Sequence, residues 1–173
     1  MPGILCGSLL AKIDEQLERA AHLAGLLPED RLDSRLDVSG GWSAGDLLGH
    51  LLDCMAGFCA ALYAAAPQDL AHFQKLRELP VNVFINPREF RTRLEIYRAH
   101  IAEGFALLED ADLARSFPTV FVPSGVTLLT LLLGNLEHLI NHKRQLFDLL
   151  KGIGVKVGTA DLYRLRNEQP DSE

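Results

Sequence analysis

The sequence lacks the features that mark nucleic-acid-binding and disulfide-stabilised proteins. Its 17 Lys and Arg residues are scattered and its net charge is −6. Because no basic stripe is present to follow a phosphate backbone, we expect no nucleic-acid partner. The three cysteines (Cys6, Cys54 and Cys59) are odd in number and follow no zinc-binding or disulfide spacing. This usage is typical of a reduced, cytoplasmic protein.

Long apolar runs are missing as well. The N-terminus has no basic start and too short an apolar run for a signal peptide. The longest apolar stretch, residues 126–133, is interrupted by two threonines and is too short to span a bilayer. We therefore expect no membrane partner. With 173 residues, 48% of them hydrophobic and 23% charged, the sequence predicts one soluble domain over residues 1–173.

Four segments are expected to form helices. The first, residues 8–27, has an apolar stripe at helical spacing and is ended by Pro28. The second, residues 44–66, follows Ser43 and has Asp46 three positions later, a pattern that resembles a capping box. Pro67 marks its end.

The other two helices have equally clear starts. Residues 87–109 follow Asn86, an N-cap residue, and begin with Pro87. Residues 128–151 follow Thr127, and Gly152 occupies the position of a C-terminal glycine cap. No segment predicts a sheet and no domain boundary is visible, so the sequence predicts an all-α four-helix bundle.

Three connections remain. Residues 68–86 include a short helical piece at 69–78 and a β-favouring run at 81–85, and they are long enough to cross the bundle from end to end. Residues 110–126 read as a second loop. The polar tail, residues 160–173, is expected to dock loosely through Leu162, Tyr163 and Leu165.

Six histidines are the candidate ligands. Three of them (His22, His72 and His100) lie among charged, loop or polar-face residues and are expected to be solvated. His138 and His142 are four residues apart, so a helix places them on one face, one turn apart, where both can bind one metal ion. They could also be hydrogen-bonded core residues or a solvated stripe. Leu139 stands where a zincin helix needs a glutamate.

His50 adds a third imidazole from another helix. Three neutral imidazoles form a ligand set for a divalent transition metal and leave coordination positions open. Two carboxylates are candidate catalytic groups: Asp53, three residues after His50, and Asp46, one turn before it. Asp53 could instead be a solvated helix position, and Asp46 only the cap. Cys54 could approach the same cavity or belong to the core. The Glu-x-x-His pairs of a di-iron bundle are missing.

Two segments resemble the DinB-like (YfiT-like) superfamily of proposed metal-dependent enzymes. They are residues 41–53, GWSAGDLLGHLLD, and residues 136–154, which contain both late histidines, Gln145 and the closing glycines. The resemblance implies His50, His138 and His142 as metal ligands. Many members have His-Arg-Gly-Gln at the last ligand where this chain has His-Lys-Arg-Gln, a difference expected to alter the packing around Gln145.

The resemblance also implies an up-down-down-up bundle with a long crossover between the second and third helices, and a homodimer. The expected cofactor is one divalent ion (Zn, Ni or Fe). The expected activity is either a transfer that uses a low-molecular-weight thiol as cosubstrate or hydrolysis of a small molecule. A non-catalytic, stress-associated bundle that binds a metal or ligand is the alternative, because no unmistakable general base accompanies the histidines.

Overall fold

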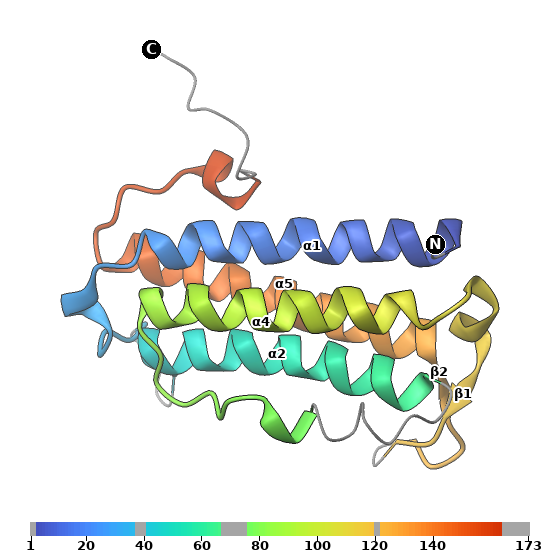
Figure 1. The fold of residues 1–173 in the computed structure, drawn as a ribbon. Helices are drawn as coiled ribbons and strands as arrows, with labels where there is room; N and C mark the ends of the chain where they lie inside the picture. Colours follow the sequence, from blue (N-terminus) through green and yellow to red (C-terminus); the bar gives the residue numbers. More distant parts are fainter. Residues whose placement is uncertain (1–2, 37–40, 67–75, 120–121, 164–173) are drawn as a thin grey trace.

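Four long helices build the protein. The computed structural model describes residues 3–36, 41–66, 76–119 and 122–163. Within them α1 (Ile4–Gly25), α2 (Ala44–Ala65), α4 (Pro87–Ala106) and α5 (Leu128–Gly152) lie side by side. Figure 1 shows α1 and α5 running in one direction and α2 and α4 in the other, the order up-down-down-up. The predicted all-α fold is confirmed.

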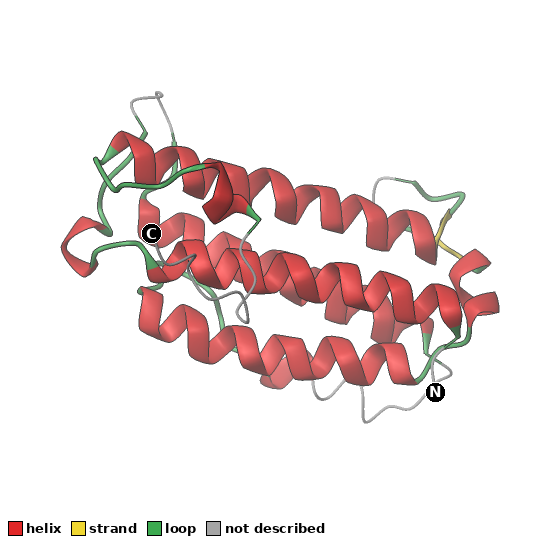
Figure 2. Ribbon diagram, turned by 90° about the horizontal axis from the view of Figure 1, so that it is seen from above, coloured by secondary structure: helices red, strands yellow, loops and turns green. Residues whose placement is uncertain are grey.

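Short elements lie at the two ends of the bundle, except for the C-terminal one, which lies alongside α1 (Figure 2). Three are 3₁₀ helices: η1 (Glu29–Arg31), η2 (Asp110–Ala114) and η3 (Thr159–Leu162). The strands β1 (Ser116–Phe117) and β2 (Val126–Thr127) pair antiparallel. The prediction that residues 110–126 form only a loop was therefore wrong at η2 and at this two-residue ladder, both of which are too short to produce a sequence pattern.

The predicted N-caps of three helices are confirmed. Ser43 forms a complete capping box with Asp46 at the start of α2, and the side chains of Asn86 and Thr127 accept backbone hydrogen bonds at the starts of α4 and α5. The predicted glycine cap was placed two residues early. Gly152 is the last helical residue, and Gly154 has the left-handed φ of +86° that glycine adopts without a steric penalty.

Helix α1 begins four residues earlier than predicted because its cap comes from a distant residue. The two Asp110 carboxylate oxygens accept hydrogen bonds from the backbone N–H groups of Leu5 and Cys6, at 3.1 and 2.9 Å. These donors have no partner inside a helix, and the hydrogen bonds lower the pKa of Asp110.

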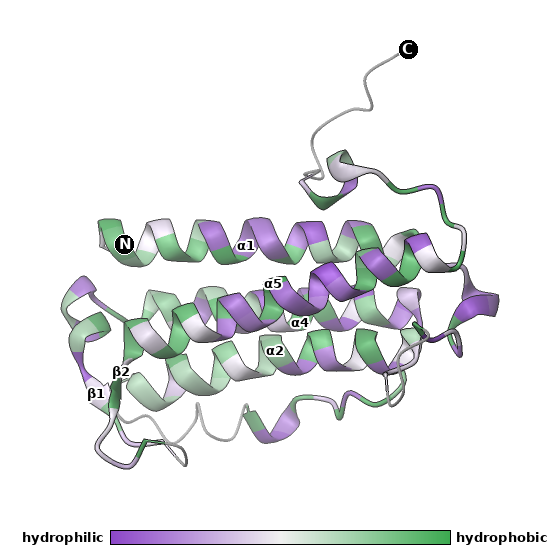
Figure 3. Ribbon diagram, turned by 180° about the vertical axis from the view of Figure 1, so that it is seen from behind, coloured by the Kyte–Doolittle hydropathy of each residue, from purple (hydrophilic) through white to green (hydrophobic). Residues whose placement is uncertain are grey.

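The core lies between the four helices and is centred on α2, which packs against both α4 and α5. Among the described residues α2 alone is long and apolar enough to cross a membrane, but 61% of its most apolar window is buried inside the bundle. By contrast, Figure 3 shows hydrophilic and hydrophobic residues alternating along α1, as expected for a helix with one face toward solvent.

The C-terminal segment docks in part as predicted. Leu162 is buried, whereas Tyr163 is exposed and lies under the Arg19 guanidinium; Leu165 lies outside the described residues. The buried Lys143 ammonium donates to Gln16 Oε1 at 2.7 Å and to the Leu162 carbonyl at 3.4 Å. This lysine, which follows His142, thus ties the segment to α1.

Candidate metal centre

The fold brings together the three histidines singled out in the sequence. His50 lies on α2, and His138 and His142 lie one turn apart on α5. The Nε2 atom of His50 is 3.2 Å from Nε2 of His138 and 3.1 Å from Nε2 of His142. His138 is exposed and the other two are half-buried, so solvent can reach the cluster.

The outer ring nitrogens of two of these histidines have neutral partners. Gln145 Oε1 lies 2.9 Å from Nδ1 of His142 and accepts a hydrogen bond from it. The Cys54 thiol, only 2% exposed, lies 3.7 Å from Nδ1 of His138. A neutral imidazole protonated at Nδ1 carries its lone pair on Nε2, so Gln145 favours the tautomer of His142 that aims this lone pair into the cluster.

This donor set fits a divalent transition metal. Bonds of 2.0–2.1 Å in a tetrahedral site place two ligand nitrogens about 3.3 Å apart, close to the distances given above. Without a cation, lone pairs on three converging nitrogens cannot all be satisfied. Burial, followed by the neighbouring imidazoles, lowers the pKa of His50 to about 4, and burial also lowers the pKa of His142. The His50 and His142 rings are therefore neutral at pH 7, the form in which histidine binds metals.

Trp42, immediately before the cap of α2, covers one side of the cluster. Its ring centroid lies 4.0 Å from that of His50 and 5.1 Å from that of His142. The indole also lines two cavities. It was not singled out from the sequence except as an aromatic residue in the first matching segment.

The first cavity, the leucine cavity, has a volume of about 480 Å³. It is lined by Leu36, Gly41, Trp42, Leu47, His142, Gln145 and Leu149. The second, the aspartate cavity, has a volume of about 330 Å³ and is lined by Trp42, Asp46, His50, Asp53, Asn82, Val83 and Phe84. Each cavity thus reaches the cluster at a different histidine.

The two candidate carboxylates differ in what they contact. Asp46 Oδ2 accepts hydrogen bonds from the backbone N–H and hydroxyl of Ser43, at 3.2 and 2.6 Å. These hydrogen bonds belong to the helix cap, the alternative role that the sequence offered for Asp46, and none of them reaches a histidine ring. Asp53 Oδ1 accepts a hydrogen bond from Asn82 Nδ2 at 3.0 Å, so the aspartate cavity holds a fixed carboxylate.

Residues 80–85, which include Asn82, form one wall of the aspartate cavity, and the sequence did not predict this role. Residues 80–85 form no strand; they lie across the start of α2, where Ile85 N–H donates to the Gly45 carbonyl at 2.9 Å. A Cβ on Gly45 would come within 2.9 Å of the Phe84 ring, and one on Gly49 within 2.9 Å of the Asn82 carbonyl oxygen. The pair of glycines one turn apart is the signal that could have indicated this close approach.

The wall is held by a polar network. Asn82, 9% exposed, also donates to Tyr97 Oη at 2.7 Å and accepts from Arg93 at 3.1 Å. Phe84 has a φ of +43°, in the left-handed region that a bulky residue rarely adopts. Such strain persists where the surroundings enforce it, which is consistent with a wall fixed for function.

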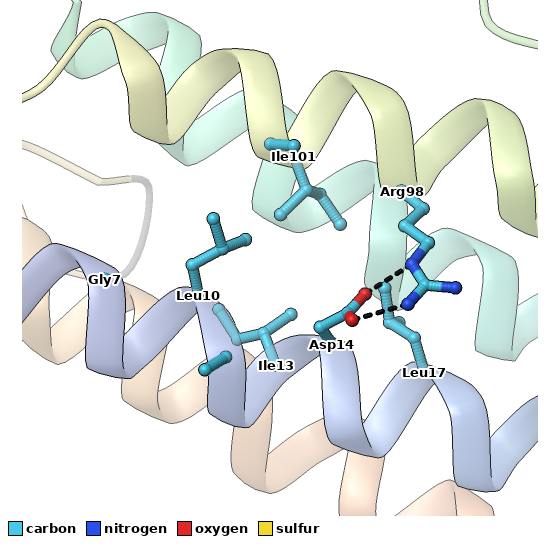
Figure 4. A pocket seen from close by; sticks show the side chains of 9 residues that line it. Gly7, Leu10, Ile13, Asp14, Leu17, Arg98 and Ile101 are labelled. Carbon is cyan, nitrogen blue, oxygen red and sulfur yellow. Dashed lines mark hydrogen bonds and ion pairs between the residues drawn. The ribbon is translucent and has the colours of Figure 1, made fainter. Parts of the chain in front are cut away.

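A third cavity, of about 360 Å³ between α1 and α4, has no such chemistry (Figure 4). Its charged lining residues, Asp14 and Arg98, form an ion pair with each other, and Arg98 also contacts Glu18. The carboxylates raise the pKa of Arg98. We therefore assign the functional site to the histidine cluster.

Comparison with known proteins found a matching family model and a similar solved structure. The sequence model of the DinB superfamily matches residues 12–146, a span that contains all three histidines and Gln145. The fold is similar to the crystal structure of a DinB-like protein, YjoA, from Bacillus subtilis. The TM-score is 0.66 at 18% identity, over 87% of this chain and 94% of that chain. A search of curated protein sequences found no match.

Proposed function

The chain belongs to the DinB superfamily, and we propose that it is a metal-dependent enzyme that binds one divalent transition ion, Zn, Ni or Fe, through His50, His138 and His142. We propose that its reaction is either a transfer involving a low-molecular-weight thiol or the hydrolysis of a small molecule. The observation that carries the proposal is the convergence of the three rings: Nε2 of His50 lies 3.2 and 3.1 Å from Nε2 of His138 and His142, and one ligand atom from each histidine lies within 4.8 Å of the others.

The chemistry follows from the ligand charges. Three neutral imidazoles leave a bound divalent ion its full charge, which supplies Lewis acidity toward an oxygen or sulfur atom of a small molecule. Gln145 and Cys54 orient two of the rings. Trp42 covers two of the rings from one side, and the cavities beside it leave room for a substrate.

Asp53 is the carboxylate best placed to act on a substrate group. It lines the aspartate cavity with His50, and its one described hydrogen bond comes from the neutral amide of Asn82. One of its oxygens is thereby held in place while acceptor capacity remains for a proton or hydrogen bond from substrate. Asp46 has less capacity to spare, because its Oδ2 accepts from Ser43 in the helix cap.

Elemental analysis tests the metal site. Protein purified after expression in metal-replete medium should contain about one divalent ion per chain, and His138→Ala should lose it. His22→Ala is the control, because His22 contacts Asp161 and not the cluster. Metal-free wild-type protein, or His138→Ala that keeps its ion, would refute the proposal.

Turnover separates an enzyme from the alternative, a non-catalytic metal- or ligand-binding bundle. The metal-loaded protein should be screened against electrophiles with several cellular thiols, and against ester and amide panels. Turnover that disappears in His138→Ala supports the enzyme. Metal binding without turnover on any panel favours the binding protein, to which the commitment of Asp46 to the cap lends support. The expected homodimer and cytoplasmic location remain proposals, and sedimentation of the purified protein tests the first.

A further inference from the structure

The two cavities beside the histidine cluster differ sharply in charge. The aspartate cavity contains two carboxylates, Asp46 and Asp53. The described lining of the leucine cavity contains no charged side chain: besides Gly41, it consists of three leucines, the indole of Trp42, His142 and Gln145. A small molecule that reaches the cluster therefore meets mostly apolar surroundings in the leucine cavity and two carboxylates in the aspartate cavity, of which Asp46 also lies 3.7 Å from the Arg35 guanidinium.

The polar groups of the leucine cavity are largely engaged with each other. Nδ1 of His142 donates to Oε1 of Gln145 at 2.9 Å, and Nε2 of His142 faces His50. What remains for a ligand is mostly apolar surface, with the amide N–H groups of Gln145 and the indole N–H of Trp42 as neutral donors, together with access to the cluster. A volume of about 480 Å³ lies within the range of roughly 300–1,000 Å³ of ordinary small-molecule pockets, which are mostly apolar with a few placed polar groups.

We propose that the leucine cavity binds an uncharged alkyl or aryl group of the substrate, and that Leu36, Trp42 and Leu149 thereby select substrates whose reactive group carries an apolar substituent. This inference rests on the proposed metal site and names the substrate class for it. Burial of apolar surface supplies the affinity, and the absence of a cation in the described wall disfavours an anionic substituent, whose charge would lose its hydration without a partner.

Hydroxamates of different chain length test the proposal, because each binds a metal through the same head group. The zinc-loaded protein is titrated with acetohydroxamate and octanohydroxamate, and the emission of Trp42, the single tryptophan of the chain, reports binding. Each methylene removed from water contributes up to about fourfold in affinity. Octanohydroxamate should therefore bind at least about 30-fold more tightly than acetohydroxamate.

Matched ligands and protein variants test whether the alkyl chain of octanohydroxamate lies in the leucine cavity. Suberic acid monohydroxamate has the same length but ends in a carboxylate, and it should lose most of the gain. Leu36→Asp and Leu36→Phe, which charge or fill the half-buried wall, should reduce the octanohydroxamate advantage to less than about threefold. Leu133→Asp is the control, because Leu133 is 47% exposed on α5 and does not line the cavity.

The outcomes separate this inference from the proposed function. Equal affinity for the two hydroxamates in zinc-loaded protein, or a chain-length gain that survives both Leu36 substitutions, overturns the inference and leaves the metal site standing. If the protein binds no metal, the cavity is tested in His138→Ala with hexan-1-ol. A blue shift of Trp42 emission that is lost on adding Leu36→Asp supports the apolar subsite, and no shift overturns it.

Discussion

Replacing Gln145 should weaken metal binding without unfolding the protein. Gln145 is exposed on α5, and the hydrogen bond that its Oε1 accepts from Nδ1 of His142 at 2.9 Å fixes the orientation and tautomer of that ring. Gln145→Leu removes the acceptor and keeps a side chain of similar size. The His142 ring is then free to rotate or to place its proton on Nε2, and both changes oppose ligation.

The expected magnitude follows from comparable sites. Loss of an outer partner of a metal-bound histidine costs about 10- to 100-fold in metal affinity, or about 1.4–2.7 kcal/mol. Gln145→Glu supplies a carboxylate acceptor at the same place, which makes the imidazole a better donor, so this variant should bind metal at least as tightly as the wild type. The stability of the metal-free protein should change by less than about 0.5 kcal/mol, as for other exposed positions.

Competition with a chromophoric chelator measures the zinc affinity of each variant, and urea denaturation measures the stability of its metal-free form. Arg144→Ala is the control, because the neighbouring Arg144 pairs with Asp148 on the exposed side of α5. Zinc affinity of Gln145→Leu within a factor of two of wild type would refute the argument that Gln145 orients His142. So would an equal loss in Arg144→Ala.

Three further predictions concern stability and are measured by urea denaturation. Because burial lowers the pKa of His50 to about 4 from 6.5, the unfolded chain binds more protons between these pH values. The metal-free protein should therefore lose stability as the pH falls from about 6.5 toward 4, and by a smaller amount in His50→Gln; equal pH dependence in both proteins would contradict this. Ser43→Ala removes the buried capping hydroxyl and should cost about 1–2 kcal/mol, whereas Ser43→Thr keeps a hydroxyl that can both cap the helix and donate to Asp46, and should recover most of that stability. Gly49→Ala places a Cβ 2.9 Å from the Asn82 carbonyl oxygen and should cost about 1–3 kcal/mol, whereas Gly134→Ala, with no atom within 4 Å, should not destabilise; equal effects would refute the close approach.

Two of the corrections to the sequence-based predictions share a cause, a contact between residues far apart in the chain. The start of α1 depends on a carboxylate about 105 positions away, Asp110. The position of residues 80–85 depends on their contacts with Gly45 and Gly49 rather than on their β-favouring composition. The shift of the glycine cap to Gly154 is a local error: either glycine fits the pattern, and only the backbone dihedral distinguishes them.

The sequence by itself determined what depends on neighbours within a few positions. The helical spacing of apolar residues, the caps at Ser43, Asn86 and Thr127, and the shared face of His138 and His142 all follow from local backbone geometry. The superfamily resemblance added the pairing of these histidines with His50, which spacing alone left open.

Only the tertiary structure decided which side chains surround the cluster. The contact between His50 and His142 joins residues 92 positions apart, the one between Cys54 and His138 joins residues 84 apart, and Asn82 reaches Asp53 across the crossover. The leucine cavity likewise combines Leu36, Leu47 and Leu149 from three separate segments. Such contacts exist because burial of the apolar helix faces packs α2 against α5. Burial of apolar surface is non-directional, so no local pattern specifies which polar side chains this packing brings together.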